Sequence, residues 1–350
     1  MQAQENIPEI TRFDWWQALV RVLSSIEAIR HGRALYLMLL VYCGAGLALA
    51  SARASVGRGE VNWAIGQGAI ALFIAFYGAN AVGLLAMDRA LGRASRELWT
   101  AVEDALGIGH RVLFTLVVML ALVGGVGGAL AGLYWACSLP KAGPWLFVVV
   151  APATVIVIGL CLVAVAAVVA PLTGPTIWAG ATTWVCIRNL LRLMRERLLQ
   201  AAVLFAGLTL ATGLTGLACT AFVFVGGKVM AYASVYMLGV DVQPEVLMMG
   251  LFGYGLGNID AKGIPDEAVP YIQSATIGGG MVFALALVLP TLVYLRGVCE
   301  IYLSLIAADA LEVMQALRPQ PTAEGEPAPM TLREALAAQG LRPEDLEEGA

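Results

Sequence analysis

The sequence has little charge, and this shortage excludes most classes of protein. Only 13% of its 350 residues are charged and 59% are hydrophobic, whereas an average soluble domain is about 25% charged. Its mean hydropathy is +0.80. Most of the chain therefore cannot face water, which excludes a soluble enzyme and a disordered regulator. The net charge of -4 and the lack of a long basic run exclude nucleic acid as a partner.

Paired cysteines are also lacking. The six cysteines occur singly within apolar runs, and no CxxC pair is present. Disulfide frameworks and metal sites use clustered, regularly spaced cysteines. We therefore interpret these cysteines as small apolar side chains at helix interfaces, and we predict no metal site and no cofactor.

Charge is absent from six intervals that are long enough for membrane-spanning helices, each of which needs about 20 apolar residues. These intervals contain 19, 27, 29, 46, 30 and 28 uncharged residues. The predicted spans are 34–52, 63–86, 112–137, 144–171, 200–226 and 273–296. The longest interval has room for two spans, but Pro171, Gly174 and Pro175 are expected to end the helix there, which leaves 176–198 as an interfacial helix.

The positive charges are divided unequally between the two sides of these spans. Sixteen of the 21 lysines and arginines fall on the side of the N-terminus. The other five are Arg53, Arg58, Lys141, Lys228 and Lys262. The positive-inside rule then predicts that both termini are cytoplasmic. Residues 1–33 are too acidic for a signal peptide and no cleavage site follows them, so the first span is expected to stay in the membrane.

An amphipathic segment precedes each odd-numbered span, at residues 13–30, 88–106 and 177–197. The first has an apolar stripe of Trp16, Leu19, Leu23 and Ile26, and the third has one of Trp178, Trp184, Ile187, Leu191 and Met194. Such patterns suit helices that lie among lipid headgroups. The fold class predicted is an all-α membrane protein, with six transmembrane helices as three hairpins, each preceded by a cytoplasmic interfacial amphipathic helix.

The third amphipathic segment also carries a basic face, formed by Arg188, Arg192 and Arg195. These arginines are candidate contacts for anionic lipid headgroups. The alternative is that the amphipathic helices only anchor and tilt the spans.

A glycine stripe in the third span is the strongest packing signal. Gly124, Gly128 and Gly132 recur every four residues, a spacing that lets another helix approach closely. The partner helix belongs either to the same bundle or to another copy at an oligomer seam.

Apart from Arg296 at the last position of the sixth span, Asp, Glu, Lys, Arg and His are missing from the six predicted spans. Buried ionisable groups mark proton relays and catalytic centres within membranes, so their absence argues against a membrane enzyme. The two histidines, His31 and His110, lie at predicted cytoplasmic helix ends. Polar side chains that converge on a cytoplasmic pocket near either histidine would favour an enzyme after all.

Two regions outside the spans are candidate partner sites. The outer loop 228–274 is unusually apolar, and the tail 331–350 begins with a capping box and ends in acidic residues. The predicted organisation is a cytoplasmic N-terminal segment, a membrane domain, a further cytoplasmic helix, and a Pro-rich linker with an acidic tail. Their bounds are 1–33, 34–297, 298–317 and 318–350.

Part of the membrane domain resembles a family of uncharacterised multi-spanning bacterial inner-membrane proteins. The likeness lies in Leu139–Pro144, in Pro171–Ile177, and in Ala179–Gly180 followed by a helix that ends in arginines. The family's usual acidic residue beside that glycine is missing here. The resemblance implies a bacterial inner-membrane location and brings no known activity.

These observations predict an integral membrane protein that acts as a non-catalytic membrane component or scaffold, with membrane lipid as a partner. The alternative is a permease for an apolar or lipid-like solute, which would need no buried charge. A lipid-filled cavity of about 300 Å³ or more between the helices would favour the permease.

Overall fold

The computed structural model describes residues 14–139, 143–238, 244, 247–248 and 269–317. Within these ranges the chain is helical and has no β-strand. The first elements are α1 (Trp15–Leu23), the 3₁₀-helix η1 (Ser24–Arg30), α2 (Gly32–Gly57), α3 (Val61–Ala90) and α4 (Leu98–Ala136). One long helix then consists of α5 (Gly143–Ala164), the π-helical turn η2 (Val165–Val169) and α6 (Ala170–Trp178). The last elements are α7 (Thr183–Glu196), α8 (Leu198–Leu238) and α10 (Val269–Leu317).

In the described part of the chain, six helices are long and apolar enough to cross a membrane, which confirms the predicted number. They are α2, α3, α4, the continuous helix from α5 to α6, α8, and Ala284–Ile306 within α10. The chain therefore has the helices of an integral membrane protein.

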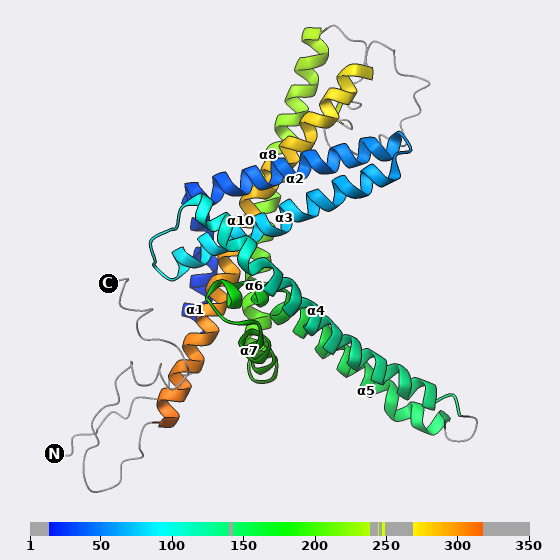
Figure 1. The fold of residues 1–350 in the computed structure, drawn as a ribbon, viewed down its shortest axis with the longest axis vertical. Helices are drawn as coiled ribbons and strands as arrows, with labels where there is room; N and C mark the ends of the chain where they lie inside the picture. Colours follow the sequence, from blue (N-terminus) through cyan, green and yellow to red (C-terminus); the bar gives the residue numbers. More distant parts are fainter. Residues whose placement is uncertain (1–13, 140–142, 239–243, 245–246, 249–268, 318–350) are drawn as a thin grey trace, which may run out of the picture.

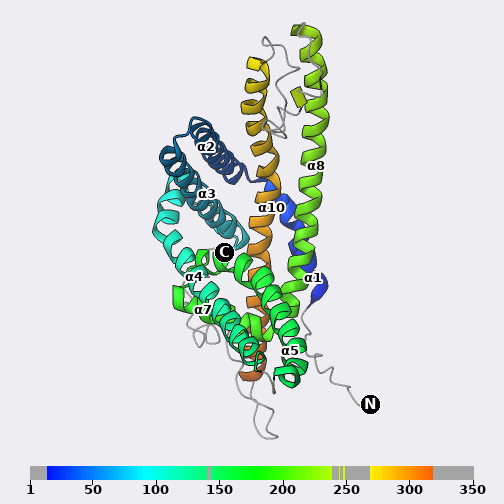
Figure 2. The ribbon, with the colours of Figure 1, turned by 90° about the vertical axis from the view of Figure 1, so that its right-hand side faces the viewer.

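The six helices are arranged as three pairs that diverge from one region (Figure 1). α2 lies along α3, α4 along α5, and α8 along α10. We call the region where the pairs meet the hub; it also contains α1, α6 and α7. Figure 2 shows the same divergence from the side, with α8 and α10 extending away from α4 and α5.

Burial is concentrated in the hub. Its largest fully buried side chains are Leu85, Met87, Met119, Leu172, Leu190, Leu204, Leu208, Ile301 and Leu305. Far from the hub the helices have few neighbours: in the most apolar stretch of α8 only 11% of the residues are buried, and in that of α4 only 17%. The apolar outer halves of the pairs therefore need lipid or another protein to cover them.

A tryptophan joins α6 to α3 within the hub. The Nε1 of Trp178 donates a hydrogen bond to Oδ1 of Asn80 at 3.0 Å, and the Asn80 Nδ2 donates to the Phe76 carbonyl at 2.8 Å. The ring lies against Gly83, where any side chain would collide with it. The buried amide of Asn80 thus serves a helix-to-helix hydrogen bond.

The expectation that Pro171, Gly174 and Pro175 end the fourth span is wrong. The helix continues through them to Trp178, and α7 begins only at Thr183. A proline lacks the amide hydrogen and clashes with the carbonyl of the preceding turn. The π-helical turn η2 ends at Val169, two residues before Pro171, and its wider winding accommodates such a disruption.

The predicted helices at 88–106 and 298–317 are not separate elements. The first is interrupted at residues 91–97, where Gly92 has a φ of +71°, a left-handed conformation that suits glycine. Its second half is the start of α4. Residues 298–317 continue α10, because Val298, Cys299 and Ile301 are buried in the hub and extend its packing without a break.

The apolar stripes of the other two amphipathic segments form only part of the contacts with the rest of the protein. In the third stripe, Trp178, Ile187 and Met194 pack in the hub. In α1, Asp14 caps the helix by accepting hydrogen bonds from the amides of Trp16 and Gln17, and the buried face contains Ala18 and Val22. Trp16 is 72% exposed. In α7 the buried face is Cys186, Ile187, Leu190 and Leu193, and Trp184 is exposed. An interfacial position of these helices stays a prediction.

Candidate functional site

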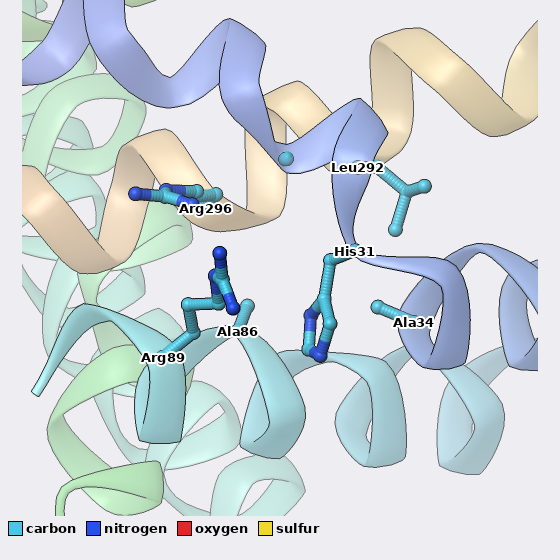
Figure 3. A pocket seen from close by; sticks show the side chains of 7 residues that line it. His31, Ala34, Ala86, Arg89, Leu292 and Arg296 are labelled. Atoms are coloured by element: carbon cyan, nitrogen blue, oxygen red, sulfur yellow. The ribbon is translucent and has the colours of Figure 1, made fainter. Parts of the chain in front are cut away.

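A small pocket lies in the hub where three spans come together (Figure 3). Its lining residues come from η1 and the start of α2, from the end of α3 and from the middle of α10: Ala28, His31, Ala34, Ala86, Arg89, Leu292 and Arg296. The space is about 240 Å³ including its open mouth, and its enclosed part has room for about one water molecule. In Figure 3 the Arg89 side chain extends from α3 toward Arg296, and the His31 ring lies across from both.

His31 is held between η1 and α2. Its Nε2 is 3.2 Å from the hydroxyl of Ser95, in the segment that connects α3 to α4. Burial lowers the pKa of His31 below 6.5, and the positive charges of Arg89, Arg296 and Arg33 lower this pKa further. The imidazole is therefore neutral at pH 7.

The two arginines of the pocket are poorly neutralised. Arg296 is 14% exposed, and its Nε is 3.7 Å from Oε1 of Glu300, an ion pair longer than a hydrogen bond. That buried Nε has no hydrogen-bond acceptor in the described part of the chain. Arg89 is exposed, and no described carboxylate lies within 4 Å of its guanidinium.

The carboxylate nearest to Arg89 in the sequence is already engaged. Asp88, whose side chain is 5% exposed, accepts two hydrogen bonds from Arg96, at 2.7 Å and 2.9 Å. Arg96 also donates to Asp104 at 2.8 Å, and the hydrogen bond to Asp88 raises the pKa of Arg96. This network fixes the segment 91–97 between α3 and α4. Because Asp88 is paired with Arg96, it does not neutralise the charge of Arg89.

The chemistry available to this pocket is anion binding. Its lining offers two guanidinium groups and an imidazole but no hydroxyl, thiol or carboxylate. Guanidinium groups bind carboxylate and phosphate oxygens through pairs of hydrogen bonds. Polar groups do converge near His31, one of the two predicted positions, and the two guanidinium groups among them suit the binding of an anion.

The predicted glycine stripe has no close neighbour among the described residues. Gly124, Gly128 and Gly132 are exposed, and a Cβ placed on any of them would have no atom within 4 Å. At this point α4 extends beyond the hub, where the pairs have separated. A role of the stripe in helix packing stays a prediction. The glycines that do contact other helices closely are Gly78, Gly83, Gly109, Gly207 and Gly297.

The predicted basic face lies on α7, apart from the pocket. Arg188, Arg192 and Arg195 are all exposed, and Arg192 forms an ion pair with Glu196 at 3.0 Å. Contact with lipid headgroups stays a prediction for these residues.

The two predicted partner sites fall largely outside the described residues. The predicted outer loop is 228–274, but α8 continues to Leu238 and α10 begins at Val269, so the segment between these two helices is shorter. The tail 331–350 lies wholly outside the described residues.

Sequence reasoning missed Arg89 and Arg296 as members of one site. Both lie at the end of a predicted span on the side of the N-terminus, which is the only signal that relates them. Comparisons with protein-family models, with curated proteins and with solved structures each give no match. The resemblance of residues 139–197 to an inner-membrane family stays an expectation.

Proposed function

We propose that this protein is a non-catalytic component of the membrane, a scaffold that gathers other membrane proteins and lipids around its three helix pairs. The observation that carries this proposal is the contrast between a buried hub and uncovered outer helices. α4 and α8 bury 17% and 11% of their most apolar stretches. A protein built around one internal site would bury these helices against one another.

We also propose how the molecule lies in the membrane. The three pairs are hairpins in a bacterial inner membrane, α1 and α7 lie near the headgroups, and the hub and both termini are cytoplasmic. The unequal distribution of lysine and arginine supports this orientation. The exposed Trp16 of α1 and the exposed Trp184 of α7 support the headgroup position, since tryptophan is favoured there.

The geometry gives less support to a permease for an apolar solute. Such a permease needs a cavity of about 300 Å³ or more that can hold its solute. The enclosed part of the hub pocket has room for about one water molecule, and two arginines line it. An apolar solute would gain little from that lining.

Purification in a mild detergent, after crosslinking in the membrane, tests the scaffold. The proposal predicts a complex larger than the 36.8 kDa monomer, with the same protein partner recovered in detergent and in polymer-bounded lipid discs. A matched variant that lacks residues 331–350 distinguishes docking on the tail from docking on the helix pairs. Recovery of the chain alone, as a monomer, from both preparations would contradict the proposal.

A further inference from the structure

We propose that the pocket between His31, Arg89 and Arg296 binds the phosphate group of an anionic ligand. The inference rests on the pocket alone and does not depend on the scaffold function.

The charge of the pocket is positive and is not balanced from within the protein. Arg89 has no described carboxylate within 4 Å, and Glu300 is the one described carboxylate that pairs with Arg296. Asp88 is engaged by Arg96, through two hydrogen bonds. Arg33 lies nearby and donates a hydrogen bond to the Ser95 carbonyl at 3.0 Å. A carbonyl is neutral, so this bond does not cancel the positive charge of Arg33.

The Nε of Arg296 supplies an independent reason for a ligand. This atom is buried and has no acceptor in the described part of the chain. A buried donor without an acceptor costs about 1–3 kcal/mol, and more when the group is charged. One phosphate oxygen in the enclosed, water-sized part of the pocket would satisfy the donor, and a second oxygen, in the open mouth with the rest of the group, would accept from Arg89 (Figure 3).

The start of α2 adds to the positive electrostatic potential of the pocket. His31 immediately precedes α2, a helix of 26 residues, and the pocket is lined by Ala34 of its first turn. The first amide groups of a helix carry partial positive charge and favour an anion. Two guanidinium groups and the start of α2 therefore act on one small volume.

The phosphate has two sources, a lipid headgroup or a soluble phosphate ester. The pocket lies beside the start of α2 and the end of α3, where two candidate spans begin and end, and its α10 residues Leu292 and Arg296 lie within the sixth, Ala284–Ile306. Basic pockets between membrane helices on the cytoplasmic side bind anionic headgroups. The rest of the lining is apolar, at Ala28, Ala34, Ala86 and Leu292. The carbon atoms next to the phosphate of a lipid or another phosphate ester can lie against these side chains, whereas inorganic phosphate has no apolar part.

Lipid binding by a charge-matched set of variants tests the proposal. The full chain is placed in phosphatidylcholine nanodiscs with and without phosphatidylglycerol, and retained lipid is measured by native mass spectrometry. Arg89→Gln with Arg296→Gln removes two charges from the pocket, and Arg188→Gln with Arg195→Gln removes two from the exposed face of α7. Arg89→Gln alone is the second test variant, because Arg89 is exposed and its loss does not unpair a described carboxylate.

The proposal predicts that the pocket variants bind phosphatidylglycerol about 10-fold more weakly or worse, since a charged hydrogen bond contributes about that factor. The α7 variant is expected to lose less of its affinity for phosphatidylglycerol. Equal losses in the pocket and α7 variants, or no loss in Arg89→Gln, would overturn the proposal. Glycerol phosphate in solution separates the sources: displacement of the lipid indicates a soluble ester, and retention of the lipid indicates a headgroup that needs its acyl chains.

Discussion

Replacing Gly83 by alanine tests the packing that holds α3 to α6. A Cβ at this position would lie 2.6 Å from Cε2 of Trp178, closer than real Cβ contacts. The ring cannot move aside freely, because its Nε1 donates a hydrogen bond to Oδ1 of Asn80 at 3.0 Å. Overpacking costs about 1–3 kcal/mol, and losing the hydrogen bond costs about 1 kcal/mol more. Alanine regains about 0.5–1 kcal/mol of helix propensity, so the net loss is about 1–3 kcal/mol.

Gly66 provides the control on the same helix. It is exposed, and a Cβ there would have no atom within 4 Å. Gly66→Ala should therefore leave the free energy of unfolding unchanged or raise it by up to about 1 kcal/mol. The two substitutions are chemically identical, so their difference isolates the contact with Trp178.

Thermal unfolding in a mild detergent measures both variants. A thiol-reactive fluorophore reports unfolding, because Cys186 and Cys299 are fully buried in the folded chain. Gly83→Ala should unfold at a lower temperature than the wild type, and a Trp178→Leu background should remove most of that difference. Equal unfolding temperatures for Gly83→Ala and Gly66→Ala would refute the packing described for α3 and α6.

Three further predictions concern the polar groups of the hub. Arg96→Ala leaves the buried carboxylate of Asp88 unpaired and should cost about 3 kcal/mol of stability, whereas Arg58→Ala removes an exposed ion pair and should cost under about 1 kcal/mol; comparable losses in the same thermal assay would contradict this. The pKa of His31 is lowered on folding, so below about pH 6.5 the unfolded chain binds more protons, and stability should fall as the pH decreases. His31→Gln should make stability depend less on pH in this range. A pH dependence of stability equal to that of the wild type would contradict the role of His31. Tyr42→Phe removes a 2.7 Å hydrogen bond between α2 and α10 and should cost about 1 kcal/mol, which an unaltered unfolding temperature would contradict.

The number of spans could be predicted from the sequence because a charge within a membrane span is costly. The charge-free intervals alone located all six helices. Helix ends were harder to predict. The sequence signals at Pro171 and Pro175 are those of a helix end, yet the π-helical turn before them lets the helix continue.

The contacts of the hub could not be predicted from one sequence. Periodicity identified the apolar positions of α1 and α7, but both helices have more than one apolar face, and packing selected Ala18 and Val22 over the stripe that contains Trp16. The glycine stripe at Gly124 and Gly128 carries the usual signal for close packing. The spacing of the glycines does not show whether a partner helix contacts that stripe. At this point of α4 the three helix pairs have diverged from one another.

The candidate site illustrates the same limit. Arg89 and Arg296 come from helices far apart in the sequence, and only the meeting of α2, α3 and α10 brings them to one pocket. Each arginine alone is typical of the positively charged side of a membrane protein. The engagement of Asp88 by Arg96, which leaves Arg89 unneutralised, depends on the path of residues 91–97.

Cysteine labelling from outside the cell tests most directly the central claim that the chain crosses the membrane repeatedly with its hub in the cytoplasm. Single cysteines are placed in a cysteine-free variant at Arg58, between α2 and α3, and at Arg93, between α3 and α4. Intact spheroplasts are then treated with a membrane-impermeant maleimide. The account predicts that Arg58→Cys reacts in intact spheroplasts and that Arg93→Cys reacts only after lysis. Reaction of both positions from the same side, or the reverse pattern, would contradict it.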